Sequence, residues 1–364
     1  RAIAEAKEQA VESFLSARLE ATNGDTTDED PFGQDSTVNI LLLGLDSRAG
    51  STEAHCDAIQ LFTIDKDKKQ VTITAVPRGT YSPLPPGKGT TSTDYYVSNA
   101  CGLGGIDYGV GQIQKILGVS ADYIVMVGFS ETLGALRHLQ LPTTETLQWL
   151  RYRRGYQIGE PQRAHNHSTF LKQLLVERIG TEDARIPQSL QYVLYRLIDT
   201  DLSFAQTQVL VDTIASFDVA VHPERVVLRM KPEYVVKEIV YDPNTLEQTL
   251  EEQIAPIRRW LSDADYSGIT QETFQQTLTQ IVADKKNDPE FLAWAFDHHL
   301  WLQIDDAAVR EAVHYDLLTH MLDQIPEKEE RAGLIADYIL EMRYTGQQEW
   351  EQKGHALLEE LHAQ

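Results

Sequence analysis

The sequence predicts an α/β fold in which helices flank a central mixed β-sheet, followed by an all-helical C-terminal domain. Short apolar runs at residues 40–43, 58–64 and 71–76 are bounded by turn residues, which is typical of buried strands. Amphipathic stretches at helical spacing, such as residues 106–117, lie among and after these runs. From residue 263 onward only the helical period remains, which favours a separate small bundle.

The turns between these runs predict the order of the elements. Charged residues 65–69 separate two apolar runs and predict an antiparallel pair of strands. Ser203 and Gln206 have the spacing of a capping box, which predicts a helix from that point to about residue 216. Residues 82–98, rich in proline, glycine and threonine, predict a long loop. Other strands are expected at residues 124–127 and 226–230, and other helices at residues 130–138, 186–198, 244–261, 270–283, 289–300, 305–322, 327–342 and 347–362.

Length and charge limit the class of protein. The chain has 364 residues, enough for two domains, and its formal net charge of −23 argues against a nucleic-acid binder, which needs a basic footprint. We expect three parts: residues 1–37 (helix and linker), 38–262 (the α/β domain) and 263–364 (a helical accessory domain with an unknown protein partner). Any phosphate ligand must then be bound by a local cluster of arginines.

The N-terminal part contains an amphipathic stretch, residues 2–19, and a polar linker, residues 21–37. The chain contains no apolar run of about 18 residues, and we expect it to be the ectodomain of a protein whose N-terminal membrane anchor has been removed. Two interpretations of residues 2–19 remain open: a helix that packs on the domain, or a stalk that rises from the membrane.

Two acids and an arginine lie at the ends of predicted strands. Asp46 follows the first apolar run, while Asp57 precedes the second and Arg78 follows the third. Carboxylate oxygens suit Mg²⁺ or Mn²⁺, and a guanidinium fork suits phosphoryl oxygens. These residues predict a metal-assisted phosphate site with Asp46 and Asp57 as metal ligands.

Several motifs resemble the LytR-CpsA-Psr family of cell-wall glycopolymer transferases, which act on teichoic acids and capsules. They are the G-x-D-S-R motif at residues 44–48, the strand that ends in Pro-Arg at residues 77–78, and Asn-Ala ahead of Gly-Gly at residues 99–105. Residues 117–123 match an L-G-x-x-x-D-Y segment, residues 146–153 resemble A-L-x-Y-x-R-x-R, and residues 159–163 resemble G-D-x-x-R. The resemblance covers about residues 38–262.

The arginine motif and the resemblance together imply a pyrophosphate site. Arg151 and Arg153, two residues apart, would point to the same face of an extended segment and reach one pyrophosphate together. The expected catalytic residues are Asp57, Arg78, Arg151 and Arg153. The expected pyrophosphate-binding residues are Arg48, Arg78, Arg151, Arg153, Arg163 and Asn166.

The resemblance also implies a reaction: transfer of a glycopolymer from a polyprenyl-pyrophosphate carrier to peptidoglycan, at the extracytoplasmic face of the membrane. Several residues depart from the family pattern, among them His55 in place of an arginine and Cys101 in place of an aromatic residue. Gly79 replaces the acid of P-R-D, Asn166 replaces an arginine, and Gly128 stands where an acidic residue is common. The alternative hypothesis is therefore a non-catalytic, polyprenyl-phosphate-binding scaffold of cell-wall assembly.

The roles of the two cysteines and of four C-terminal histidines each have two interpretations. Cys56 and Cys101 are either a disulfide or two buried thiols. His298, His299, His314 and His320 could suggest a metal cluster, but a di-iron type of site needs two E-x-x-H pairs and only Glu311 and His314 form one, so ordinary histidines are favoured.

Overall fold

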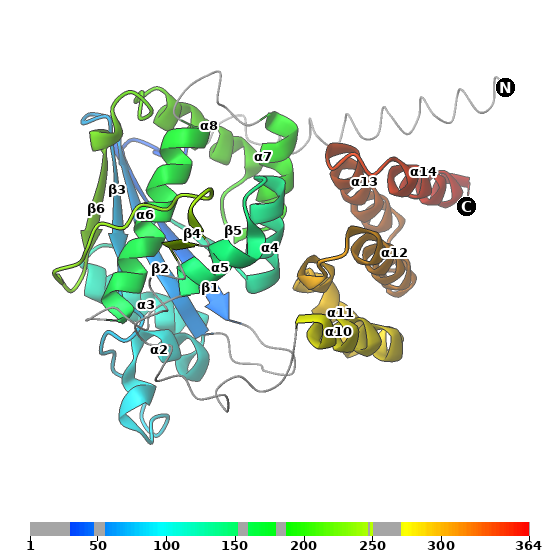
Figure 1. Ribbon diagram of the computed structural model, residues 1–364, viewed down its shortest axis with the longest axis horizontal. Helices are drawn as coiled ribbons and strands as arrows, with labels where there is room; N and C mark the ends of the chain where they lie inside the picture. The colour runs from blue at the N-terminus through cyan, green and yellow to red at the C-terminus, as the bar shows by residue number, and fades with distance from the viewer. Residues whose placement is uncertain are drawn as a thin grey trace.

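The structure is a computed structural model that describes residues 30–46, 55–151, 159–179, 187–246, 248–249 and 271–363. The predicted fold class is confirmed: a six-stranded mixed sheet has helices on both faces and is followed by a helical region (Figure 1). The predicted N-terminal helix, most of the helix expected at residues 244–261, Arg48 and Arg153 lie outside the described residues.

The sheet has the strand order β5-β4-β1-β2-β3-β6. Strand β1 is antiparallel to β2, β2 to β3 and β4 to β5, whereas β1 is parallel to β4 and β3 to β6. The predicted antiparallel pair and the predicted edge strand are therefore confirmed. The strands are β1 Thr37–Asp46, β2 His55–Asp65, β3 Gln70–Ala75, β4 Tyr123–Val127, β5 Asp199–Thr200 and β6 Val226–Met230.

Seven described α-helices precede residue 271 and five follow it. The first group is α2 Val97–Gly104, α3 Ile106–Leu117, α4 Phe129–His138, α5 Thr143–Arg151, α6 Glu160–Arg178, α7 Gln188–Tyr195 and α8 Phe204–Ala215. The second group is α10 Gln271–Lys285, α11 Pro289–Asp297, α12 Ala307–Gln324, α13 Lys328–Tyr344 and α14 Gln348–Ala363. Short 3₁₀ turns occur at η1 Ser92–Tyr95, η2 Pro223–Arg225 and η4 Leu300–Gln303.

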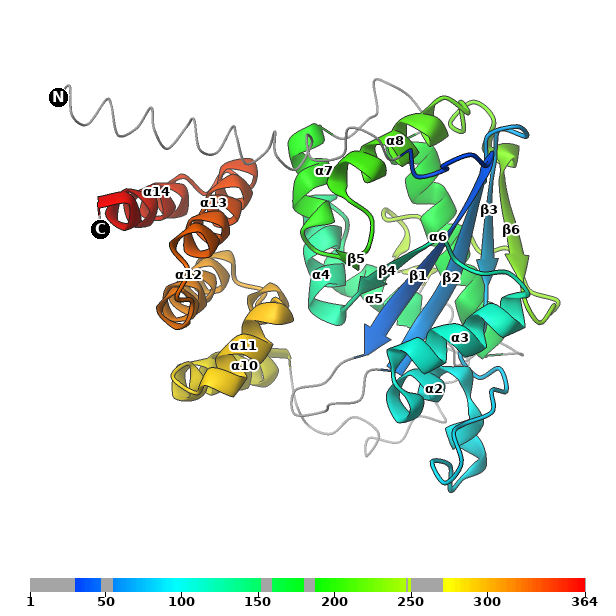
Figure 2. The same ribbon diagram turned by 180° about the vertical axis from the view of Figure 1, so that it is seen from behind.

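The two faces of the sheet pack into separate cores because successive side chains of a strand point to opposite faces. Leu41, Leu43 and Ile59 pack with α2 and α3 on one face. Ile40 and Ile64 pack with α6 and α8 on the other. Figures 1 and 2 show these two helix layers on either side of the sheet.

A disulfide joins Cys56 of β2 to Cys101 of α2, with their Cα atoms 6.0 Å apart. This decides the alternative that the sequence left open. Both cysteines are buried in the core on the α2–α3 face. The bond therefore fixes α2 to the first residues of β2.

One family motif and one predicted segment are helical. Most of the motif at residues 99–105 is part of a helix, because α2 already begins at Val97 and includes Gly104. Gly105, with φ of +90°, separates α2 from α3 and has the backbone conformation that glycine tolerates best. The segment expected to be extended around Arg151 is helical up to that residue, since α5 buries Thr146 and Trp149 at helical spacing.

Residues 231–241 form an irregular strap that crosses α6. The side-chain amide of Gln162 donates to the Lys237 carbonyl at 2.8 Å and accepts from the Lys237 N–H at 2.8 Å. Gln173 bonds Tyr241 in the same two-way manner, at 2.6 and 2.9 Å. Each amide thus replaces a backbone partner and holds the strap against the helix.

The helices after residue 271 pack on the α/β domain. Leu197, which follows α7, shares one buried cluster with Leu292, Trp301 and Leu317. The predicted helices of the C-terminal region are confirmed, with ends that differ by a few residues at most. Within the described part of the chain, no helix combines the length and apolar character needed to cross a membrane.

Replacing both Cys56 and Cys101 with serine is expected to lower the free energy of unfolding by about 2–5 kcal/mol, because the bond closes a long loop. Urea denaturation without reductant measures this difference. Reductant should bring the wild-type midpoint to that of the double variant and leave the variant unchanged. A wild-type midpoint that does not move after complete reduction would contradict the role assigned to the bond.

Candidate functional site

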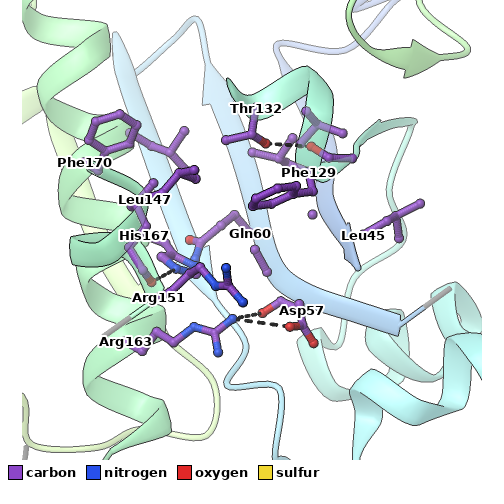
Figure 3. A pocket seen from close by; sticks show the side chains of 17 residues that line it. Leu45, Asp57, Gln60, Phe129, Thr132, Leu147, Arg151, Arg163, His167 and Phe170 are labelled. Carbon is purple, nitrogen blue, oxygen red and sulfur yellow. Dashed lines mark hydrogen bonds and ion pairs between the residues drawn. The ribbon is translucent and has the colours of Figure 1, made fainter. Parts of the chain in front are cut away.

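A cavity of about 220 Å³ lies between one face of the sheet and helices α4, α5 and α6. Its walls are mostly apolar, and Figure 3 shows Asp57, Arg151 and Arg163 together at one end, with Phe129, Leu147 and Phe170 farther in. The other lining residues are Leu42, Gly44, Leu45, Ala58, Gln60, Val127, Gly128, Thr132, Leu150, His167 and Leu171.

An irregularity in the β1–β2 pairing aims Asp57 at this cavity. Gly44 pairs with Ala58 and Leu45 with Cys56, so Asp57 is an extra residue without a partner in β1. At such a bulge the regular alternation of side chains between the two faces of the sheet is interrupted, so two successive side chains can point to the same face. Asp57 and Ala58 consequently both line the cavity.

Gly44 allows the two strands to approach closely beside the bulge. A Cβ atom at residue 44 would lie 2.9 Å from the Cβ of Ala58, which is too close for two carbon atoms. Close packing against Ala58 thus explains why the G-x-D motif has a glycine at residue 44.

Asp57 binds two arginines from different elements. Nη1 of Arg78, from the loop after β3, donates to Asp57 Oδ1. Nη2 of Arg163, in the first turns of α6, lies 3.6 Å from Asp57 Oδ2 and donates to the Asp57 carbonyl at 3.3 Å. The Asp57 and Arg78 side chains keep exposed fractions of 23% and 27%, so the cluster is accessible to a ligand.

Arg151 is the last residue of α5 and lines the cavity with an exposed side chain. Its guanidinium lies 5.7 Å from the centre of the Phe129 ring, a cation–π contact. The predicted geometry of Arg151 and Arg153 on one extended face is wrong at Arg151, and Arg153 lies outside the described residues.

The remaining predicted residues divide into two groups. Asp46 ends β1 opposite His55, two residues from Asp57, so the backbone places both acids at the same end of adjacent strands. Asn166 is fully buried in α6, accepts a hydrogen bond from Gln162 at 2.9 Å and does not line the cavity. The structure therefore does not bring Asn166 to the predicted pyrophosphate site.

Neither Gln60 nor His167 was predicted from the sequence as a site residue. The buried Gln60 amide donates to the Ala164 carbonyl at 3.0 Å and accepts from Ser168 Oγ at 2.7 Å, which fixes α6 on β2. Nε2 of His167 lies 2.7 Å from the Leu150 carbonyl oxygen and joins α6 to α5. The helical spacing of residues 163, 167 and 170–171 was a signal that one face of α6 lines the site.

Comparison with known proteins agrees with the sequence motifs. Residues 4–133 match the model of the LytR_cpsA_psr family. The resemblance to the LytR-CpsA-Psr family that the motifs indicated is therefore confirmed over this part of the chain. The match includes Asp46, Asp57 and Arg78 and ends within α4, before Arg151 and Arg163.

Curated relatives resemble a limited part of the chain. A Bacillus cereus polyisoprenyl-teichoic acid–peptidoglycan teichoic acid transferase, TagU, is 30% identical over 113 residues, which are 30% of this chain and 36% of that protein. The Bacillus mycoides protein of the same name is 30% identical over 102 residues, 27% of this chain and 32% of that protein. The chain thus spans about a third of the length of these relatives. The crystal structure of B. subtilis TagV aligns with 60% of this chain and 98% of that one, at a TM-score of 0.45 and 16% identity.

Acid should destabilise the protein partly through His167. Burial, to which the charge of Arg163 adds, lowers the pKa of His167 from its ordinary 6.5 to about 4. Between these values the unfolded chain binds a proton that the folded protein does not, so the stability due to neutral His167 is complete above pH 6.5 and declines toward pH 4.

A His167→Gln protein, whose amide can still donate to the Leu150 carbonyl, should lose less thermal stability than wild type between pH 6.5 and pH 4. Melting temperatures across this range measure the effect, with pH 8 as the reference for each protein. Curves that stay parallel would contradict the assignment of a buried, neutral imidazole.

Proposed function

We propose that the protein transfers a glycopolymer from a polyprenyl-pyrophosphate carrier to peptidoglycan, with cleavage of the pyrophosphate. One observation carries the proposal: a single cavity combines apolar walls with a cluster of arginines at one end. A lipid-linked pyrophosphate has the same division into an apolar chain and an anionic head. The match of residues 4–133 to the LytR_cpsA_psr family model supports the same reaction class.

The apolar walls would bind the part of the polyprenyl chain next to the pyrophosphate. An isoprenoid chain contributes only apolar surface, and burial of such surface stabilises a complex by roughly 25 cal/mol per Å². Leu147, Leu150 and Phe170 line the cavity and belong to one buried cluster or its edge, so this wall is formed before any ligand binds.

The arginines would bind the pyrophosphate and the charge that develops during transfer. Arg78, Arg151 and Arg163 present planar forks, which suit several phosphoryl oxygens better than ammonium groups do. An acceptor hydroxyl would attack the phosphorus that carries the glycopolymer, forming a new P–O bond while the bridging P–O bond breaks. Polyprenyl phosphate would leave with the bonding electrons, and the acceptor proton would pass to solvent.

We propose that a magnesium-type cation binds at the acid pair at this end of the sheet. Asp46 and Asp57 lie on adjacent strands, and carboxylate oxygens are the donors that Mg²⁺ or Mn²⁺ prefers. We infer that these two residues hold the cation, which would neutralise charge on the pyrophosphate when bound. Asp57 would otherwise remain paired with Arg78 and Arg163.

A non-catalytic scaffold is the second candidate. Asp57 is engaged by both Arg78 and Arg163, and the residue after Arg78 is Gly79 rather than another acid. Such a site could bind a polyprenyl phosphate and leave its phosphates intact. Either function agrees with an extracytoplasmic location and a membrane anchor, because a disulfide such as Cys56–Cys101 persists in oxidising compartments.

Loss of the Arg78 guanidinium should slow catalysis strongly but leave the fold intact. With a polyprenyl pyrophosphate and Mg²⁺, Arg78→Ala should release phosphate about 100-fold more slowly than wild type, or worse. Arg78→Lys should be intermediate, because it keeps the charge without the fork. Arg229→Ala, at an exposed arginine of the edge strand β6, is the matched control and should match wild type. If wild type and Arg78→Ala are equally inactive while both bind lipid, the scaffold replaces the transferase.

A bulkier residue in the cavity wall should block the lipid chain without touching the arginines. Ala58→Leu adds apolar volume to the cavity and is expected to weaken binding of a long-chain polyprenyl phosphate. Its affinity for inorganic pyrophosphate should stay unchanged. Thr72→Leu, which introduces the same residue on the opposite face of the sheet, is the control. Calorimetry on both ligands checks this, and equal loss of both affinities would argue against a separate lipid slot.

A further inference from the structure

Helix α4 has one side on the cavity and another on the C-terminal helices. Gly128, Phe129 and Thr132, at and just before its start, line the cavity. The same helix makes close contacts with η4, between α11 and α12. Figures 1 and 2 both show α4 between the sheet and the C-terminal helices.

Polar groups of α4 find their partners in the C-terminal region. His299 Nδ1 lies 3.0 Å from Glu131 Oε1, and Gln303 Nε2 donates to Ser130 Oγ at 2.9 Å. Arg137 donates to the Leu302 carbonyl. Glu131 and Ser130 have exposed fractions of 7% and 3%, so these hydrogen bonds compensate for buried polar groups.

Apolar side chains also pack tightly in the contact between α4 and η4. A Cβ atom at Gly134 would lie 2.7 Å from Leu302 Cδ1, so the Leu302 side chain of η4 packs on α4 at a position where α4 has no side chain. Leu302 is buried in the cluster that includes Trp301 and Leu317 of the C-terminal helices. A shift of η4 would therefore be transmitted to α4 rather than absorbed by a gap.

The carboxylate of Glu131 connects this contact to the cavity. A Cβ atom at Gly128 would lie 2.2 Å from Glu131 Oε2, so the carboxylate lies directly against the Gly128 backbone. Gly128 itself lines the cavity, and Phe129 beside it lies under the Arg151 guanidinium. One chain of contacts thus runs from His299 through Glu131 and Gly128 to the cavity wall.

We propose that the C-terminal helical domain holds the α4 wall of the lipid cavity, with His299 and Gln303 as its positioning residues. The lipid part of this inference rests on the proposed function. The helical domain is then a component of the binding site as well as a module for a partner. A protein that binds this domain and moves η4 would change how well the cavity accepts the lipid chain.

Two variants test the contact between α4 and the C-terminal helices, and one of them perturbs it more strongly than the other. His299→Ala leaves the buried Glu131 carboxylate without its imidazole partner, whereas Gln303→Ala removes one hydrogen bond to Ser130. His299→Asn restores a short side-chain N–H donor and serves as the rescue variant. His320→Ala is the matched control, because His320 lies on α12 and its Nδ1 is 2.7 Å from the Asp316 carbonyl oxygen of its own helix.

Amide hydrogen exchange of residues 128–138, without lipid, reports the position of α4 directly. Exchange should be faster in His299→Ala and Gln303→Ala than in wild type, and should return toward wild type in His299→Asn. In His320→Ala it should not change. Unchanged exchange in both alanine variants would overturn the proposal, whatever their lipid affinity.

Binding supplies the second measurement. The alanine variants should bind a long-chain polyprenyl phosphate about tenfold more weakly and inorganic pyrophosphate as wild type does. Wild-type lipid affinity in variants with faster exchange would overturn the claim that α4 sets the cavity. If α4 exchange rises as expected but wild type itself binds no lipid, the positioning of α4 stands and the proposed function fails.

Discussion

The extra residue in β2 is the constraint on which the site depends. On a regular strand Cys56 and Ala58 would share one face and Asp57 would take the other. The bulge lets Cys56 join Cys101 on the α2 face while Asp57 and Ala58 both face the cavity. The disulfide at Cys56 therefore fixes β2 immediately before the bulge that directs the Asp57 side chain into the cavity. Arg78 and Arg163, distant in sequence, meet because this carboxylate lies between them.

Two of the three helical walls of the cavity, α6 and α4, are held by segments outside it. The strap of residues 231–241 fastens α6 through the amides of Gln162 and Gln173, and the C-terminal helices fasten α4 through His299 and Gln303. The positions of these two walls therefore depend on segments that do not line the cavity. Gly128, one of the departures from the family pattern, acquires a structural reason, because the Glu131 carboxylate occupies the space of a side chain there.

The fold was largely predictable because strand and helix signals are local. The apolar runs predicted β1, β2 and β3, and the Ser203–Gln206 capping box is present at the start of α8.

The site was predictable only in part. Arg151 and Arg153 are two residues apart, a spacing that brings both side chains to one face of an extended segment. The segment is nevertheless helical up to Arg151, because α5 buries Trp149 against the rest of the domain. Asn166, four residues after Gln162, shares its side of α6 and bonds to it rather than reaching the cavity. The disulfide and the domain contact depend on tertiary distances, which no local pattern contains.

Under the proposed function, an acidic protein must bind an anionic head group, and the Asp57 cluster offers a way to limit the electrostatic repulsion. With a formal net charge of −23, the chain gathers Arg78, Arg151 and Arg163 where the ligand head would lie. In the structure Asp57 neutralises two of them. A pyrophosphate must therefore compete with this carboxylate for the arginines, and a cation held by Asp46 and Asp57 would remove that competition by taking over the carboxylate. Under the proposed function, metal and lipid head group would then bind cooperatively, since each stabilises the arrangement that the other requires.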